Sequence, residues 1–103
     1  MIEPYEIAAK LRKITDYDVE CDVLWPSAKI KIDGWEIGFF LDAGVIDYVD
    51  FTRSNDHRFV TFDDLWPNCP LDLLSSDIKE ELQHIIDANS KSSFKRLLAT
   101  TNS

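Results

Sequence analysis

The sequence predicts one α+β domain: an N-terminal helix, a five-stranded antiparallel meander, and one or two C-terminal helices packed on one face of the sheet. Apolar residues recur at helical spacing near both ends of the chain. From Tyr17 to Asp64 the period changes to two, and glycine or proline separates the alternating runs. The length of 103 residues suits a single core. We therefore expect one domain over residues 1–103, with a frayed polar tail at 99–103.

The first helix is predicted from Pro4 to Ile14. Proline fits its first turn, since the N–H that proline lacks would have no partner there. Ile7, Leu11 and Ile14 recur at helical spacing, which predicts one stripe of side chains buried against the rest of the domain.

Three strands with regular alternation follow, over Tyr17–Val23, Ala28–Ile32 and Trp35–Leu41. The dipeptide Asp33-Gly34 is the strongest turn signal in the chain, because a two-residue hairpin turn needs positive φ at both central positions. This turn sets Ile32 opposite Trp35, so the apolar residues of the two strands share one face.

Charges across these hairpins are matched. Lys31 faces Glu36 in the second hairpin. The first hairpin, registered in the same way, sets Glu20 opposite Lys31 and Asp22 opposite Lys29. We interpret these charged residues as cross-strand ion pairs, which is a structural role and not a functional one.

The fourth strand is predicted near Val45–Arg53, and two registers stay open for it. A three-residue turn over 42–44, with Gly44 in the left-handed conformation, places Asp47 near the edge of the core. A four-residue turn exchanges Asp47 for Asp50. In the first register the core side holds Val45, Val49 and Phe51, and the other face holds Ile46, Tyr48, Asp50 and Thr52.

A fifth strand is predicted near Arg58–Asp64, with Val60 and Phe62 opposite Phe51 and Val49. A proline-containing loop, Leu65–Leu74, then leads to a helix capped by Ser75 or Ser76. The expected buried stripe of that helix is Ile78, Leu82, Ile85 and Ile86. Ser90–Ser93 interrupts the pattern, and a short third helix is indicated by Phe94, Leu97 and Leu98.

The chain is acidic, with 11 basic and 19 acidic residues and a net charge of −8. Such a charge repels nucleic acid and anionic lipid and attracts basic proteins. We therefore expect a protein partner, without direct contact to nucleic acid or membrane. Solubility alone is the other explanation of the charge.

Two further features of the sequence indicate the cellular compartment of the protein. Cys21 and Cys69 are too few for a secreted disulfide framework, and we expect both to be reduced. No basic-then-apolar leader opens the sequence, and its apolar runs are too short to span a bilayer. These features favour a cytoplasmic protein.

Catalytic patterns are missing from the sequence. His57 follows Asp56 in a predicted turn, and His84 lies on a helix, with no nucleophile at a recognisable spacing to either. The cysteines and histidines are too scattered for a zinc site, and three isolated glycines cannot form a phosphate-binding loop. We expect no catalytic residue, metal or cofactor, and hence no enzyme.

The sheet face away from the helices carries an unusual mixture of aromatic and acidic side chains. Aromatic anchors surrounded by charges are typical of protein interfaces. The alternative is that the terminal helices or the Leu65–Leu74 loop cover this face. The predicted partner-binding residues are Glu36, Phe40, Asp42, Asp47, Tyr48, Asp50, Asp56, Phe59 and Asp63.

Length, acidity, element order and the segments Asp33–Asp50 (DGWEIGFFLDAGVIDYVD) and Pro70–Ser76 (PLDLLSS) resemble small bacterial immunity proteins. The kind most resembled is the immunity partner of contact-dependent growth inhibition toxins. The resemblance implies a protein that binds a cognate toxin domain, often a basic nuclease such as an RNase, and occludes its active site. It assigns no residue by position, because these proteins share no single fold.

Two other classes of function stay open. An acidic adaptor or regulatory protein would use the same face for a partner unrelated to toxins. A small-molecule-binding or enzymatic domain would instead need a pocket next to the sheet.

Overall fold

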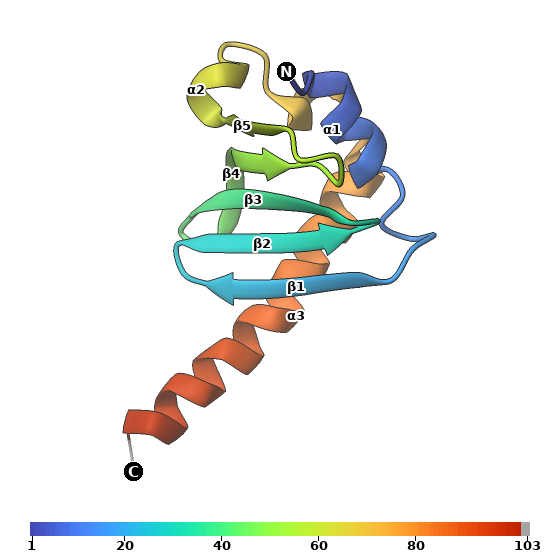
Figure 1. The fold of residues 1–103 in the computed structure, drawn as a ribbon. Coiled ribbons are helices and arrows are strands. Elements are labelled where there is room, and N and C mark those ends of the chain that lie inside the picture. Colours follow the sequence, from blue (N-terminus) through green and yellow to red (C-terminus); the bar gives the residue numbers. More distant parts are fainter. Residues whose placement is uncertain (102–103) are drawn as a thin grey trace.

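The computed structural model describes the backbone of residues 1–101 and the side chains of residues 1–90. The predicted α+β fold is confirmed: a five-stranded antiparallel sheet in the order β1-β2-β3-β4-β5 follows an N-terminal helix and precedes C-terminal helices (Figure 1). The strands are β1 (Val19–Leu24), β2 (Ser27–Ile32), β3 (Trp35–Asp42), β4 (Val45–Arg53) and β5 (Phe59–Thr61). The helices are α1 (Pro4–Leu11), α2 (Phe62–Leu65), the 3-10 helix η1 (Pro70–Leu73) and α3 (Ser76–Thr101).

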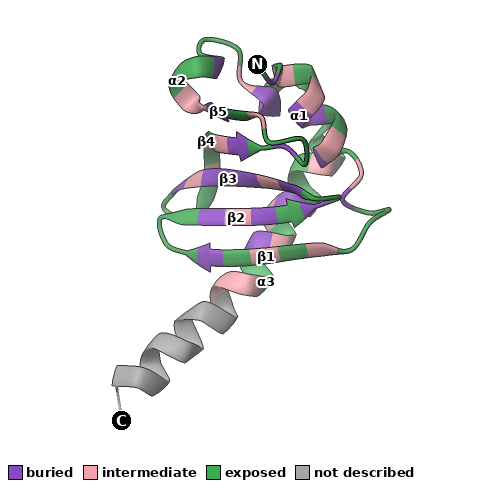
Figure 2. Cartoon of the chain, viewed as in Figure 1, coloured by how far each residue is buried: buried purple, intermediate pink, exposed green. Residues whose placement is uncertain are grey.

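One face of the sheet forms the core. Helix α3 runs behind the sheet and past β1, while α1 and α2 lie at the end of the sheet formed by β5 (Figure 1). Buried and accessible positions alternate along β2, as expected for a sheet covered on one side (Figure 2). The largest fully buried side chains are Phe39, Ile2, Ile7, Leu11, Ile30, Ile32, Ile37, Leu41, Leu82, Ile86, Val49 and Val60.

Helix α1 is shorter than predicted. It ends at Leu11, and the residues from Arg12 to Asp16 form turns. The N–H of Ile14 donates to the carbonyl of Leu11 at 3.3 Å, a three-residue spacing tighter than that of an α-helix. Ile14 is still buried beside Ile7 and Leu11, so the predicted apolar stripe is confirmed although the helix bound is wrong.

The register of the first three strands is confirmed. Asp33 and Gly34 form the two-residue turn with φ of 50° and 77°, and Ile32 lies opposite Trp35. Lys31 lies opposite Glu36, with 4.0 Å between Lys31 Nζ and Glu36 Oε1.

The two ion pairs predicted in the first hairpin are wrong. Glu20 lies opposite Lys31, and Asp22 lies opposite Lys29, as expected. In the described part of the chain, however, no ion pair joins either couple; Lys31 instead reaches Glu36 on its other side. Exposed pairs of this kind gain little over solvation by water, so the register does not force them together.

Strand β4 departs from both predicted registers because it contains two β-bulges. Gly38 lies opposite Phe51 while Phe39 lies opposite Val49, which leaves Asp50 between two ladder positions. Further along, Phe40 is paired with Tyr48 and Leu41 with Ile46, which leaves Asp47 out of the ladder in the same way. Each bulge inserts one extra residue and shifts the alternation by one.

The bulges change which side chains of β4 reach the core. Ile46, Val49 and Thr52 share a face with buried β3 residues, so the core-facing spacing is three instead of two. The predicted placement of Val45 and Phe51 in the core is therefore wrong, as is the placement of Ile46 and Thr52 on the other face. Val45 is 60% exposed. The turn before β4 has two residues, Ala43 and Gly44, both with positive φ, and not the predicted three.

The fifth strand ends earlier than predicted. Thr52 lies opposite Val60, and the chain leaves the sheet after Thr61. The Thr61 N–H and hydroxyl both donate to Asp64 Oδ2, at 2.9 and 3.2 Å, which caps helix α2. Phe62 therefore opens a helix and does not pair with Val49, and Asp63 lies in the first helical turn and not in a strand.

Helix α3 begins as predicted. The Ser75 hydroxyl accepts a hydrogen bond from the N–H of Ile78 at 3.4 Å, and the predicted apolar stripe packs on the core. The predicted interruption at Ser90–Ser93 is wrong, because a single helix extends to Thr101. Residues 102–103 of the predicted tail lie outside the described residues. Within those residues, no helix combines the length and apolar character needed to cross a membrane.

Candidate functional site

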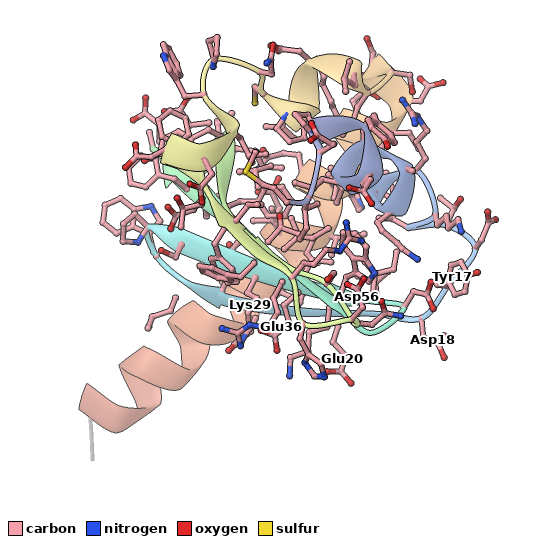
Figure 3. The ribbon with its side chains drawn as sticks, turned by 45° about the horizontal axis from the view of Figure 1, so that its top comes forward. Tyr17, Asp18, Glu20, Lys29, Glu36 and Asp56 are labelled. Carbon is pink, nitrogen blue, oxygen red and sulfur yellow. The ribbon has the colours of Figure 1, made fainter. Side chains whose placement is uncertain are left out.

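The face of the sheet opposite the core is accessible, and we call it the open face. Figure 3 shows Glu20, Lys29 and Glu36 on it, whereas Tyr17 and Asp18 lie to one side, in the segment before β1. The strand side chains directed to the open face are Glu20, Asp22, Leu24, Ser27, Lys29, Lys31, Glu36, Phe40, Asp42, Val45, Tyr48, Phe51, Arg53, Phe59 and Thr61. The face is thus mixed in charge near β1–β3 and aromatic towards β5.

Four rings form a continuous row across β3, β4 and α2, which we call the aromatic row. Phe40 stacks on Tyr48 with 5.1 Å between ring centroids, and Tyr48 contacts Phe62 at 4.4 Å. Phe62 in turn contacts Trp66 at 5.7 Å. These separations are typical of favourable aromatic contacts. Trp66 at the end of the row is 68% exposed, so the row leads from the sheet to the surface.

Beside the aromatic row lies a hollow of about 270 Å³, bounded by β4, α2 and the segment 66–72. Three rings of the row line it, together with two carboxylates: Tyr48, Phe62, Trp66, Asp47 and Asp72. Asp47 reaches the hollow because its bulge removes it from the ladder. Carboxylates beside accessible rings create a site suited to a positively charged group.

The second bulged residue, Asp50, lies elsewhere on the open face. It lines a shallow depression of about 250 Å³ with Asp22, Lys29 and Phe51. The floor is Gly38, over which the Phe51 ring packs so closely that a Cβ at Gly38 would lie 2.1 Å from a ring carbon. The glycine therefore allows the aromatic ring to lie flat on the sheet.

A third cluster, near β5, is internally neutralised. Phe59 is 50% exposed and stacks with Phe51 at 6.1 Å, while the Arg53 guanidinium lies 5.4 Å from the Phe59 ring centroid. Glu36 forms ion pairs with both neighbouring cations, at 3.9 Å from Arg53 and 4.0 Å from Lys31. Glu36 is therefore already paired within the sheet.

Asp56 is not part of the open face. It lies in the β4–β5 turn, where it accepts hydrogen bonds from the Ser54 hydroxyl and, at 3.0 Å, from Arg58 Nε. These bonds, the one from Ser54 first, hold the pKa of Asp56 below its ordinary value. Arg58 also bonds Glu6 of α1 at 3.0 Å, so Asp56 belongs to a cluster that ties the turn to α1.

The structure thus divides the nine predicted partner-binding residues. Phe40, Tyr48 and Asp47 lie together along the aromatic row and its hollow. Asp42 is exposed at the end of β3, and Asp63 is exposed beside Phe62 in α2. The remaining four lie away from the aromatic row and its hollow: Asp50, Glu36, Phe59 and Asp56.

Sequence reasoning missed Phe62 and Trp66, which complete the aromatic row. A usable signal was present: Thr61 followed three residues later by Asp64 is a capping pattern that starts a helix. This capping pattern would have predicted that the strand ends before Phe62 and that Phe62 begins a helix.

Cys21 and Cys69 are free, and burial raises the pKa of Cys21 to about 11, so its thiol stays protonated at neutral pH. Among the side chains that the structure describes, no group of three or more potential metal ligands occurs.

The chain was compared with family models, with curated proteins and with solved structures. The family model for a domain of unknown function, DUF7693, matches residues 2–88, which include every strand of the sheet and the start of α3. No curated protein and no solved structure matches the chain.

Proposed function

We propose that this chain, which belongs to the DUF7693 family, is a cytoplasmic immunity protein that binds a basic toxin domain through the open face and occludes its active site. The observation that supports this most is the pair of bulges in β4. They release Asp47 and Asp50 from the ladder and leave both carboxylates exposed beside aromatic side chains. Bulges recur at functional sites because they redirect individual side chains.

Charge supports a basic partner. The chain has a net charge of −8. On the open face Lys31 and Arg53 are both close to Glu36, whereas no described cation forms an ion pair with Asp42, Asp47 or Asp50. Unpaired exposed carboxylates attract a positively charged surface and raise the rate of encounter. A nuclease active site that binds phosphates is one such surface.

The aromatic row supplies the other requirement of a stable complex. Large, rigid, partly exposed rings bury apolar area with little loss of side-chain entropy, and they dominate the binding energy of many interfaces. Phe40 and Tyr48 are partly buried already, so they are held in place before the partner arrives. Acidic residues would then govern association, and the aromatic residues would govern dissociation.

The deciding experiment is purification of the chain from its source organism with whatever it binds. We expect a basic nuclease domain, encoded by a neighbouring reading frame, whose activity is inhibited by the purified chain.

The rates of association and dissociation are then measured at two salt concentrations. Asp50→Lys should slow association and weaken its salt dependence, because screening acts over about 8 Å at physiological ionic strength. Tyr48→Ala should instead speed dissociation.

Asp18→Lys is the matched control, since it makes the same charge change in the segment before β1, away from the open face. Equal effects of Asp18→Lys and Asp50→Lys would mean that net charge alone, and not this face, governs binding. Recovery of a large assembly without a toxin would overturn the immunity function and favour an acidic adaptor.

A further inference from the structure

The hollow beside the aromatic row contains two kinds of group that attract cations. Its lining includes the aromatic residues Tyr48, Phe62 and Trp66 and the acidic residues Asp47 and Asp72. Ring faces attract a cation through their quadrupole, and a carboxylate attracts it directly. The two effects act on the same small volume here.

Three other rings in the described part of the chain, those of Trp35, Tyr17 and Phe59, lie close to the protein's own cations. Arg58 lies 6.0 Å and Lys10 lies 5.4 Å from the ring centroid of Trp35, and Arg53 lies 5.4 Å from that of Phe59. In the described portion of the chain, no Lys or Arg lies over any ring that lines the hollow. Neither of its two carboxylates takes part in an ion pair with a described residue.

We propose that the hollow binds the guanidinium group of an arginine side chain from the basic partner, which makes this inference rest on the proposed function. Arginine suits the hollow better than lysine, because its planar group stacks on aromatic rings and donates several N–H bonds to carboxylates at once. The hollow has a volume of about 270 Å³, which is room for one side chain.

The proposal is tested with a small probe, N-acetyl-arginine amide, added to the intact ¹⁵N-labelled chain. The indole N–H signals of Trp25, Trp35 and Trp66 are followed by NMR. We expect a saturable shift of the Trp66 signal and no comparable shift of the other two. The matched probe is the corresponding citrulline amide, which has nearly the same shape without the charge, and it should leave the Trp66 signal in place.

Variants locate the contacts. Asp47→Asn and Asp72→Asn should each weaken arginine binding by about three- to tenfold, since a charge-assisted hydrogen bond becomes a neutral one. Trp66→Ala, followed through the backbone amides of Asp47 and Tyr48, should weaken it by a similar factor of about three to ten. Trp25→Ala is the control, because Trp25 and Trp66 are both 68% exposed and Trp25 lies at the β1–β2 turn.

Three results would overturn the assignment. An equal shift of the Trp66 signal by the citrulline amide would mean contact with an apolar surface only. Tighter binding of N-acetyl-lysine amide than of N-acetyl-arginine amide would exclude a guanidinium site. Unchanged binding after Asp72→Asn and Trp66→Ala would place the probe elsewhere. The outcome is separable from that of the proposed function: a basic partner bound equally well by the Trp66→Ala, Asp72→Asn double variant would keep the function and remove the arginine site.

Discussion

The sheet has a regular half and an irregular half, which differ in how their strands pair. From β1 to β3, the paired residues follow one another without a skipped position, and core and open-face residues alternate strictly. From β3 to β4, the ladder skips Asp50 and then Asp47, and β5 has only three residues before α2 begins. The candidate binding residues gather in the irregular half.

The two halves differ because the buried face fixes the direction of each side chain more strictly in the regular half than in the irregular half. Strict alternation with a buried face fixes every side chain to one side, so the regular half is determined by its core. A bulge relaxes this constraint, because one residue leaves the ladder without disturbing the core contacts on either side. In β4 both released residues are aspartates. The irregular half therefore exposes charge next to aromatic rings at little cost to packing.

The sharpest test of this division uses two neighbours in β3. Phe39 is 1% exposed in the core, whereas Phe40 lies on the open face against Tyr48. Phe39→Ala should lower the free energy of unfolding by about 3–5 kcal/mol. Phe40→Ala should lower it by roughly 1 kcal/mol, mainly from the lost ring contact. Urea unfolding measures both, and similar losses would contradict the separation of core from binding face.

The next largest effect is expected at Gly38, where the two halves meet. A Cβ there would lie 2.1 Å from the Phe51 ring, so Gly38→Ala should cost about 1–3 kcal/mol as the ring is displaced. In a Phe51→Ala background the same change should become neutral or slightly stabilising, because alanine loses less backbone entropy than glycine on folding. A double-mutant cycle by urea unfolding measures this coupling. Additive losses would mean that the ring over Gly38 is not the cause.

The regular half was predictable because its signals are local and agree with one another. Asp33-Gly34 fixes one turn, and alternation on both sides of it then leaves a single register. The α3 cap and stripe were predictable for the same reason: Ser75 precedes apolar residues at helical spacing. Which charged neighbours actually pair was not predictable, since exposed ion pairs depend on small energy differences.

The irregular half was not predictable, for a physical reason. No characteristic residue type marks a bulge in a sequence. In β4 the bulges change the spacing between core-facing residues from two to three, at Ile46, Val49 and Thr52. An alternating interpretation then puts Phe51 in the core and Thr52 outside. The two registers considered for Asp47 and Asp50 each assumed one aspartate facing inward, whereas the structure exposes both.

A threonine in the core tests the bulged register itself. Thr52 is fully buried, and its hydroxyl has no hydrogen-bond partner among the residues that the structure describes. Thr52→Val keeps the shape and removes the unsatisfied group, so it should raise the free energy of unfolding by about 1 kcal/mol. Thr61→Val is the matched control with the opposite sign: its hydroxyl bonds Asp64, and losing that cap should cost about 1 kcal/mol. A loss at Thr52 would mean that its hydroxyl is satisfied in solution.

The smallest effect on stability is expected at the two aspartates that the bulges release. Asp47 and Asp50 are exposed, and neither forms an ion pair with a described residue. Asp47→Asn and Asp50→Asn preserve side-chain size, so each should change the free energy of unfolding by no more than about 0.5 kcal/mol. If the carboxylates serve binding, the same variants should still slow association with a basic partner, because they remove charge from the face that meets it.

Asp56→Asn gives the contrast: it breaks the bonds to Ser54 and Arg58 that lower the pKa of Asp56, so it should destabilise the fold without affecting association. A destabilisation of both bulge variants greater than that of Asp56→Asn would show that these aspartates hold the strand together, and would remove the main support for a binding role of the irregular half.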